Sequence, residues 1–419
     1  MSRGGRYRAF WRGTLLLPAL LAFSRLIAFA AVTDTGIHVP PAYDTLVPPS
    51  AGDSYDDPAF GTAIKRVSDA MATADSASRV GLTSISTEYS TASPFNSSGS
   101  RLLLLHQSYF ALYDGKGRYQ GDLPLEVNAA SEPRWSRRDP NALYFVRGNS
   151  LLKLDVTSAQ ITPLHTFVEH TKISGRGESE ISPDGDHFVF AGDDRYVFVY
   201  EISTDRKGPA LDTAGRPFDS LYIAGDNRVT IGWNQSGSER FTGIELYDRN
   251  MSFQRQLTRS IGHMRLTRDT NGGDVLVWTN SNDPAPLPGC PNAIVKVRLD
   301  DAQQTCLLPL PWSLAVHVTA PDGNGWAFVE TYAPSNPQPG TDGWAPYTNE
   351  ILQLRLDGSE TRRLLHHRSR PANSYGYQPK SSVSRDGGKL VFTSNYNLQS
   401  LLGYPADYTD AYLVTIPTR

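Results

Sequence analysis

SYGYQPKSSVSRDGGKLVFTSN, which spans residues Ser374 to Asn395, predicts a strand, a tight turn and a second strand. Asp386-Gly387-Gly388 supplies the positive φ angles that such a turn requires. Lys389–Thr393 follows the turn and is rich in residues that favour strands. The same unit occurs earlier as ISPDGDHFVF at Ile181–Phe190. This repeated hairpin decides the fold class.

The hairpin recurs along the chain at a regular interval. Its turn falls at Gly99, Asn141, Gly185, Asn227, Gly272, Gly323 and Gly387. A period of about 40–50 residues with short strands in each unit is typical of β-propeller blades. The sequence therefore predicts an all-β fold, a seven-bladed β-propeller with four-stranded antiparallel blades.

The last blade lacks a strand, and the first blade is preceded by a strand that has no partner. The chain ends soon after the third strand of the last blade, Ala411–Ile416, while Ala63–Asp69 reads as an isolated strand. Pairing these two segments completes the last blade and removes the open sheet edges. We therefore expect the N-terminal strand to close the ring.

The first 31 residues have the pattern of a secretory signal peptide. A basic region with four arginines precedes an apolar stretch from Thr14 to Ala31, and Ala28-Phe29-Ala30 fits the cleavage signal. An uncleaved anchor is the alternative, but Ser24 and Arg25 interrupt the apolar stretch. We therefore divide the chain into a signal peptide (1–31), a leader that wraps the surface (32–60) and one propeller domain (61–419). We expect a monomer that is secreted or periplasmic and has no membrane span after cleavage.

Composition narrows the classes of partner. The 419 residues carry a net charge of −3, and no basic run occurs in the body of the chain, so a nucleic-acid partner is not expected. Cys290 and Cys306 are the two cysteines. In an oxidising compartment they either form a disulfide or remain free thiols, and two cysteines alone do not make a zinc site.

Three long insertions share one position within their blades. Asn280–Asn292, Tyr332–Thr348 and Asn395–Asp410 each join the second and third strands of blades five, six and seven. In a propeller these loops rise from the face on which the inner strands begin, so we expect one loop face over blades 5–7. Loops of this length in a compact domain usually carry function.

The predicted inner strands carry polar residues toward the central channel. These are Glu132, Arg134, Glu178, Glu180, His263, Arg265, His317 and Lys380, with Tyr375, Tyr377 and Gln378 just before the last turn. Such groups either bond to one another and to channel water or form a pocket with the long loops. Both readings remain open from the sequence.

The repeated Ser-x-Asp-Gly turn, as at Ser182–Gly185 and Ser384–Gly387, resembles the TolB-like propeller repeat over residues 61–419. The last blade, with QPKSSVSRDG at Gln378–Gly387, resembles that of oligogalacturonate lyases. Those lyases place metal-binding histidines and a glutamine before this turn. Here Gln378 is present, but Tyr377 and Lys380 stand at the flanking positions. We therefore assign no metal ligands and leave any cofactor open.

Ulvan-lyase-like propellers, which this chain resembles in blade number, use histidine and tyrosine for β-elimination. The reaction on a uronic acid needs a base, an acid and a cation that neutralises the carboxylate. The resemblance implies that His263 and Tyr377 are base and acid, that Arg265 is the neutralising cation, and that His317 is a second candidate. The predicted substrate-binding residues are Glu178, Glu180, Tyr375, Gln378, Trp344 and Arg370.

Other reaction classes lack their motifs. No G-x-S-x-G elbow, H-E-x-x-H or Walker sequence occurs. The sequence thus favours a polysaccharide lyase that acts on an acidic polysaccharide or oligosaccharide. The alternative is a non-catalytic TolB-like propeller that binds a glycan or an envelope protein on the loop face of blades 5–7, because exposed aromatic residues suit sugar stacking equally well.

Overall fold

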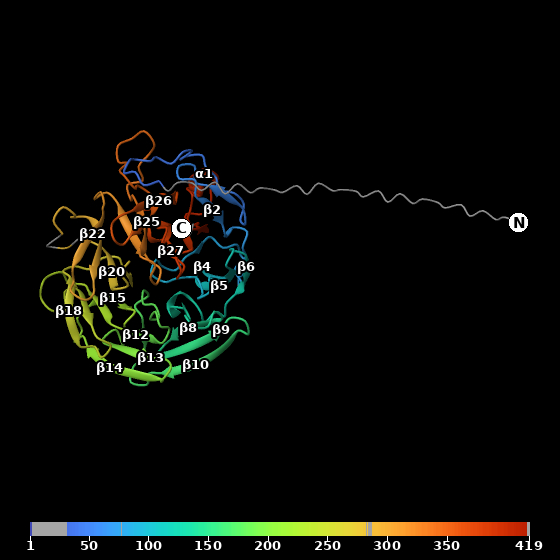
Figure 1. The fold of residues 1–419 in the computed structure, drawn as a ribbon. Coiled ribbons are helices and arrows are strands. Elements are labelled where there is room, and N and C mark those ends of the chain that lie inside the picture. The colour runs from blue at the N-terminus through green and yellow to red at the C-terminus, as the bar shows by residue number, and fades with distance from the viewer. Residues whose placement is uncertain (2–31, 77, 282, 284–286, 417–419) are drawn as a thin grey trace. The chain divides into compact units, whose positions relative to one another are not determined.

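The strands of the described residues form seven antiparallel sheets that follow one another around a ring (Figure 1). The computed structural model describes residue 1 and residues 32–76, 78–281, 283 and 287–416. The predicted signal peptide lies outside these residues, apart from Met1. No helix within the described ranges is long and apolar enough to cross a bilayer. The predicted seven-bladed propeller is confirmed.

Six blades have four strands each, in the predicted order from the axis outward. Blades 1–3 are β3 (Ile85–Ser86), β4 (Arg101–His106), β5 (Tyr109–Asp114), β6 (Tyr119–Asp122); β7 (Arg134–Trp135), β8 (Ala142–Arg147), β9 (Ser150–Asp155), β10 (Gln160–Thr166); and β11 (Ile173–Ser174), β12 (His187–Gly192), β13 (Tyr196–Glu201), β14 (Arg206–Asp212). Blades 4–6 are β15 (Phe218–Ile223), β16 (Val229–Trp233), β17 (Gly243–Tyr247), β18 (Phe253–Thr258); β19 (Met264–Arg268), β20 (Asp274–Thr279), β21 (Ala293–Arg298), β22 (Gln304–Pro309); and β23 (Ala315–Thr319), β24 (Trp326–Tyr332), β25 (Glu350–Arg355), β26 (Thr361–His366). A short 3-10 helix, η1 (Ala129–Ser131), precedes β7.

The seventh blade joins both ends of the propeller, as predicted. Its strands are β27 (Ser382–Val383), β28 (Lys389–Ser394), β29 (Asp410–Thr415), β2 (Ala63–Arg66) and β1 (Ser54–Asp56). The register places Ile64 opposite Val414. β1 makes this a five-stranded blade and extends the sheet into the segment expected to be a simple leader. Residues 57–62 reverse the chain between β1 and β2, so β1 lies antiparallel to β2. β1 therefore covers the edge that β2 would otherwise leave unpaired.

Apolar side chains fill the spaces between adjacent blades. Trp135, Trp233 and Trp278 are fully buried there, and each belongs to a cluster that draws on two neighbouring sheets. Each blade therefore packs against the next one, and the apolar faces of all the blades are covered only when the ring is closed.

The long insertions occupy the predicted loops between second and third strands. Residues 395–409 include a short helix, α1 (Leu398–Leu402). Cys290, in loop 280–292, forms a disulfide with Cys306 on β22, with 6.2 Å between the Cα atoms. The structure thus resolves the alternative that the sequence left open, and this loop is tied to the outer strand of its blade.

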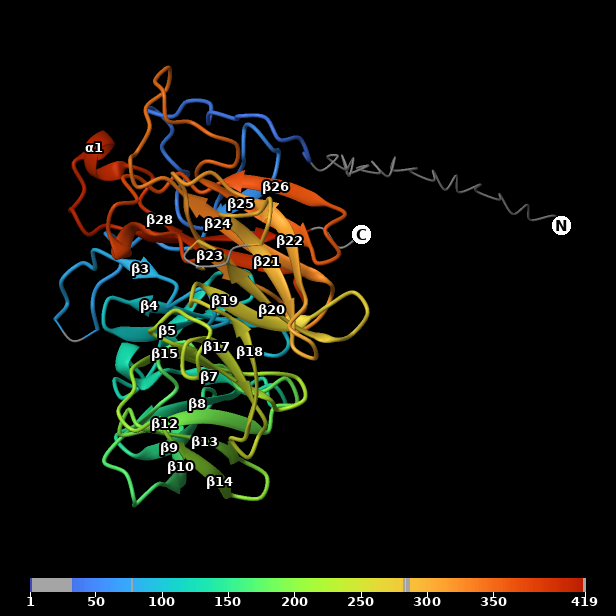
Figure 2. The same ribbon diagram turned by 90° about the vertical axis from the view of Figure 1, so that its left-hand side faces the viewer.

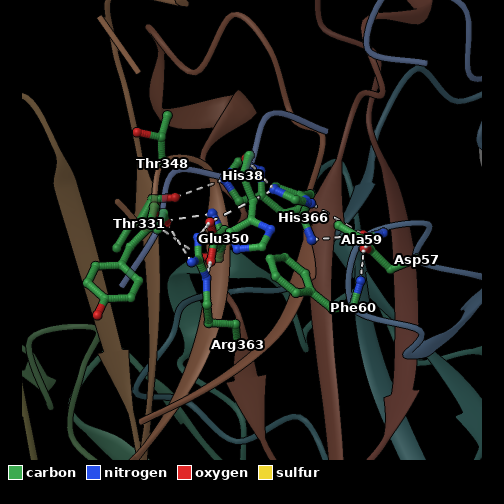
Figure 3. Close-up of polar contacts among 12 residues, drawn as sticks. His38, Asp57, Ala59, Phe60, Thr331, Thr348, Glu350, Arg363 and His366 are labelled. Carbon is green, nitrogen blue, oxygen red and sulfur yellow. Dashed lines mark hydrogen bonds and ion pairs between the residues drawn. The ribbon is translucent and has the colours of Figure 1, made fainter. Parts of the chain in front are cut away.

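The leader is bound to blade 6 by a buried polar network (Figure 3). His366 Nε2 lies 3.0 Å from the carbonyl oxygen of His38, and the backbone N–H of His366 donates to Oδ2 of Asp57 (3.0 Å). Arg363 donates through Nε to Oε2 of Glu350 (2.7 Å) and through Nη1 to the carbonyl oxygen of Gly36 (2.7 Å). Figure 2 shows the leader beside the loop between β24 and β25.

We predict that ring closure depends on the ion pair between Arg66 of β2 and Asp410 of β29. Nη2 of Arg66 lies 2.8 Å from Oδ2 of Asp410, and both side chains are buried. Asp410→Asn removes the buried partner of Arg66 and leaves the partly exposed Asp69, 3.6 Å from Nη2, as the remaining carboxylate. The free energy of unfolding should therefore fall by about 3 kcal/mol. Chemical unfolding of the purified protein measures the change.

The matched control is Asp212→Asn, which breaks the exposed ion pair between Asp212 and Arg195. It should change the free energy of unfolding far less than Asp410→Asn does, because solvent screens an exposed ion pair. Equal effects of the two substitutions would show that closure does not depend on the Arg66–Asp410 pair.

Candidate functional site

The inner strands begin at the end of the channel where the long loops leave. The carbonyl oxygen of His263, just before β19, accepts a hydrogen bond from the N–H of Thr279, the residue before loop 280–292 (3.0 Å). Pro379, before β27, accepts one from Thr393 near loop 395–409 (2.8 Å). In blade 6, Ala315 pairs with Tyr332. We call this end the loop face and the opposite end, where the Ser-x-Asp-Gly turns lie, the turn face.

Residues 87–93, which we call the channel segment, cross the central channel. The sequence predicted an inner strand for blade 1, but that strand is limited to Ile85–Ser86. The channel segment contacts blade 2 through Glu88–Arg134, blade 3 through Thr91–Glu178 and Ser93–Glu180, blade 5 through Tyr89–His263 and Thr91–Arg265, blade 6 through Tyr89–His317, and blade 7 through Thr87–Lys380 and Ser93–Val383. Contacts with five blades of one ring place this segment on the axis.

Tyr89 of the channel segment meets two histidines on the loop side. Its Oη lies 2.8 Å from Nδ1 of His263, and its ring meets His317 edge-on with 5.6 Å between the ring centres. The ring centres of His263 and His317 are 4.5 Å apart. His263 is exposed and Tyr89 is half-buried, so a molecule at the loop face can reach this pair.

His317 is held in place by a buried carboxylate. Its Nδ1 lies 2.7 Å from Oε1 of Glu330, which also accepts a hydrogen bond from the backbone N–H of Lys380 (2.7 Å). The backbone N–H of Ser381 donates to the other oxygen of Glu330. Burial acts to raise the pKa of Glu330, but the hydrogen bonds from His317 and Ser381 outweigh it and hold the pKa below its usual value. Glu330 therefore stays ionised and fixes both His317 and the turn at Lys380.

The environment shifts the pKa values of the two basic groups at this end of the channel. Desolvation by the surrounding protein is the larger cause, and the neighbouring His317 the smaller one, that lower the pKa of His263 to about 4. The residue nevertheless keeps exposed surface. Burial lowers the pKa of Lys380 to about 8. Nζ of Lys380 lies 4.2 Å from the centre of the Tyr375 ring, which is itself exposed. Near neutral pH, His263 is thus neutral and Lys380 largely charged.

Glu178 faces the same region from blade 3. The hydroxyl of Tyr222 donates to its Oε2. Burial raises the pKa of Glu178 to about 7, against the effect of this hydrogen bond. Two predicted substrate-binding residues, Glu178 and Tyr375, therefore lie near Tyr89 of the channel segment. His263 and Lys380 lie at the same end of the channel.

Arg265 and Glu180 lie farther along the channel, toward the turn face. Nη1 of Arg265 donates to the carbonyl oxygen of Thr91 (2.6 Å), and Oε1 of Glu180 accepts from the N–H of Ser93 (2.8 Å). Both side chains are buried. The channel segment thus separates Arg265 on β19 from His263, although His263 lies only two residues earlier, just before that strand. The predicted pairing of His263 with a neutralising Arg265 is not present.

Tyr377 and Gln378 are half-buried and stand apart from this cluster. Tyr377 ends a short 3-10 helix, η2 (Tyr375–Tyr377), and its carbonyl oxygen accepts a hydrogen bond from Oγ of Ser369. Among the polar and ring contacts of the described residues, none joins Tyr377 or Gln378 to His263. The tyrosine that His263 contacts is Tyr89.

Trp344 and Arg370 lie where the leader meets the loop face. Arg370 is buried beneath the leader, with its Nη2 2.7 Å from Oδ1 of Asp44 and its guanidinium 3.7 Å from the centre of the Tyr43 ring. Trp344 packs edge-on against Tyr43 at 5.3 Å between ring centres. The structure therefore gives Arg370 and Trp344 contacts with the leader that the sequence did not predict.

Tyr89, Glu330 and Tyr222 belong to this region and were not predicted from the sequence. Tyr89 was not predicted because an ordinary inner strand was expected before the turn at Gly99. The composition of residues 83–100 could have indicated an irregular segment. These residues are rich in serine and threonine, with one glutamate and one tyrosine among them. Hydroxyl-rich segments bond to polar partners rather than to a regular ladder.

Comparison with known proteins shows the fold. No family model and no curated protein matches the chain. An oligogalacturonate lyase in complex with manganese has a similar structure, with a TM-score of 0.61 and 14% sequence identity over 87% of this chain and 96% of that one. The oligogalacturonate lyase from Vibrio parahaemolyticus matches with the same TM-score and coverages at 12% identity. At these identities the similarity shows a shared propeller and nothing of the chemistry.

The residues of this site do not fit a manganese ion. No group of three or more His, Cys, Asp or Glu side chains in the described ranges is arranged to hold a metal. The Nδ1 atoms of His263 and His317 already face Tyr89 and Glu330. The catalytic scheme proposed below therefore contains no metal ion.

We predict that His263 titrates near pH 4 in the folded protein, because the surrounding protein disfavours its charged form. NMR of the protein with ¹³C-labelled histidine, followed from neutral to acidic pH, measures this pKa. The His263→Asn variant identifies the signal by its loss. Titration of that signal at the value of a free histidine would place His263 in open solvent instead.

Proposed function

We propose that this chain is a β-elimination lyase that cleaves an acidic, uronate-containing polysaccharide or oligosaccharide. The contact between Tyr89 Oη and His263 Nδ1 at the loop face carries the proposal. It joins a neutral imidazole to a protonated phenol, and Glu330 links the backbone of the cationic Lys380 to His317 of the same region. Base, acid and cation are the three kinds of group that the reaction needs. The shared fold with two oligogalacturonate lyases supports it at the level of architecture.

His263 acts as the base and Tyr89 as the acid in this proposal. In one neutral tautomer, Nδ1–H of His263 donates to Tyr89 Oη and Nε2 holds a free lone pair. Nε2 takes the proton from the carbon next to the uronate carboxylate, and the electron pair forms the new carbon–carbon double bond. The bond from the adjacent carbon to the glycosidic oxygen breaks, and Tyr89 protonates that oxygen. The imidazolium then returns a proton from Nδ1 to the tyrosinate, which leaves both groups neutral.

Lys380 stabilises the charge that develops on the substrate carboxylate. Its position is set by Glu330, which binds the backbone N–H of Lys380 and Nδ1 of His317 through the same oxygen. Tyr375 lies against its ammonium group and offers an exposed ring at the loop face. Glu178, with its raised pKa, carries part of its population as a neutral acid near pH 7 and so repels an anionic substrate less than an ordinary glutamate. The channel segment fills the axis beneath these groups, so the substrate approaches from the loop face.

A secreted or periplasmic location belongs to the same proposal. The disulfide between Cys290 and Cys306 is typical of proteins in oxidising compartments, where such polysaccharides are met.

A second candidate is a non-catalytic propeller that binds a glycan or an envelope protein on the loop face of blades 5–7. One observation favours it: Tyr377 and Arg265 do not join His263, so the constellation implied by the family resemblance is absent. Binding of a uronate glycan by a protein that never releases an unsaturated product would select this candidate.

We predict that the mature protein releases products with the ultraviolet absorbance of an unsaturated uronate from at least one polysaccharide in a panel of uronate-containing polymers. Tyr89→Phe and His263→Ala should each lower kcat by about 10²–10⁴-fold, because each removes a proton-transfer group. Tyr377→Phe tests the tyrosine implied by the resemblance and should leave kcat nearly unchanged. Tyr119→Phe, on the exposed outer strand of blade 1, is the inert control.

The assay is repeated with a chelator, and an activity lost with the chelator would contradict the metal-free scheme. Full activity of Tyr89→Phe would remove Tyr89 from the mechanism. Absence of product from the whole panel would favour the binding propeller.

We predict a bell-shaped pH dependence of kcat/KM. Activity falls as pH drops through about 4, where His263 gains a proton and can no longer act as a base. It also falls as pH rises through about 8, where Lys380 loses the charge that binds the carboxylate. Lys380→Arg should move the alkaline limb upward, since arginine stays charged. An alkaline limb that is unchanged in this variant would assign the limb to another group.

A further inference from the structure

The middle of the leader lies over two buried arginines in the connection between blades 6 and 7. The leader is fixed on both sides of this region. Nε2 of His366 lies 3.0 Å from the carbonyl oxygen of His38, and Nη1 of Arg66 donates to the carbonyl oxygen of Pro49 (3.1 Å). We call residues 39–48, between these two points, the strap. Most of its residues are exposed, so few contacts hold the strap down.

Two residues of the strap bind Arg370. Nη2 of Arg370 lies 2.7 Å from Oδ1 of Asp44, and the guanidinium lies 3.7 Å from the centre of the Tyr43 ring. Trp344, from the loop between β24 and β25, packs edge-on against the same tyrosine. The side chain of Arg370 is 5% exposed, whereas that of Asp44 is 58% exposed. The strap thus brings an exposed carboxylate to a buried cation.

The two buried arginines have more donor groups than the strap uses. Arg368 donates through Nη2 to the carbonyl oxygen of Pro41 (2.9 Å). Nε of Arg368 and Nη1 of Arg370 are buried and have no hydrogen-bond partner among the described residues. Within the same residues, Asp44 is the only carboxylate in an ion pair with either arginine. Because unused buried donors are costly, the site beneath the strap favours a ligand with more acceptor oxygens than one aspartate offers.

This site adjoins the proposed catalytic site on the loop face. Oγ of Ser369 donates to the carbonyl oxygen of Tyr377, the last residue of η2. η2 begins at Tyr375, whose ring contacts the ammonium group of Lys380. Arg370 is therefore joined by a short series of contacts to the group proposed to bind the uronate carboxylate. A polymer with several uronate residues can place a second carboxylate at such a neighbouring cation.

We propose that Arg368, Arg370 and Trp344 form a second uronate subsite. Tyr43 and Asp44 of the strap occupy this subsite when no substrate is bound. A uronate presents on one sugar ring what the strap presents with two residues, a carboxylate for the guanidinium and a flat apolar face for an aromatic side chain. The strap therefore competes with the polysaccharide and lifts when the polysaccharide binds. The ligand class rests on the proposed function.

The test removes the carboxylate of the strap and adds a uronate back. In the mature Asp44→Ala variant, galacturonate binds the folded protein at Arg370, so Tm should rise with the logarithm of its concentration. The wild-type protein should need about tenfold more galacturonate for the same rise, because Asp44 competes for the site. At equal concentration and ionic strength, acetate should give a smaller rise, and galactose, which has no carboxylate, should give none. Asp53→Ala, which removes an exposed carboxylate of the leader outside the strap, should respond as the wild-type protein does.

The double substitution Asp44→Ala with Arg370→Gln should lose the additional response, which assigns the bound galacturonate to Arg370. Equal responses of Asp44→Ala and the wild-type protein would overturn the subsite. Equal rises with acetate and galacturonate would show a general carboxylate-binding site and overturn the sugar assignment.

Hydrogen exchange of the wild-type protein provides a measurement that needs no variant. Exchange at residues 39–48 should become faster as galacturonate displaces the strap, and exchange that is unchanged or slower would overturn the competition. Neither measurement requires turnover. A chain that releases no unsaturated product but shows both responses keeps the subsite, and an active lyase without them loses it.

Discussion

The pairing of β2 with β29 is the constraint on which the rest of the structure depends. It gives the seventh blade its outer strands from the N-terminal end of the chain, so the ring closes through backbone hydrogen bonds. Since the apolar clusters lie between neighbouring blades, an open ring would expose two of their faces to water. Closure also fixes the distance across the axis, and polar side chains of different blades meet only because of it. Arg66 and Asp410, buried within the closing pair, couple this backbone junction to a side-chain network.

Polar groups at the axis need partners, and the channel segment provides them. The inner strands are short, and their side chains would otherwise face one another across a water-filled channel. Residues 87–93 enter this space with hydroxyl, carboxylate and carbonyl groups that bond to several blades at once. On the loop side the result is a site in which His263 is neutral and Glu178 partly protonated, together with the charged Glu330 and Lys380. On the turn side it is a set of fully charged groups around Glu180. The two ends of one channel therefore have different electrostatics.

The sequence predicted the fold because its signals are local. The Ser-x-Asp-Gly turn and the apolar strand after it are contiguous, and their period determines the blade count, the loop face and the closing strand. The site depends on contacts between residues far apart in the sequence, and periodicity does not contain them. His263, His317, Glu178 and Tyr375 could be named as candidates because they precede recognisable turns. Tyr89 could not, because an irregular segment has no period. The strand pattern placed Arg265 on the channel, but it does not show that Thr91 lies across the channel from it.

His263 and Arg265 show why a repeat fold does not determine chemistry. His263 directly precedes β19 and Arg265 is the second residue of that strand, so the alternation of a strand alone would place them on one side and in one site. The channel segment passes between them, with Tyr89 on His263 and the carbonyl oxygen of Thr91 on Arg265. One irregular segment thus divides a regular set of inner positions into two compartments. Two propellers with the same blades and different channel segments would present different groups at the loop face, so the groups that this chain presents there follow from residues 87–93 and their partners rather than from the blades they cross.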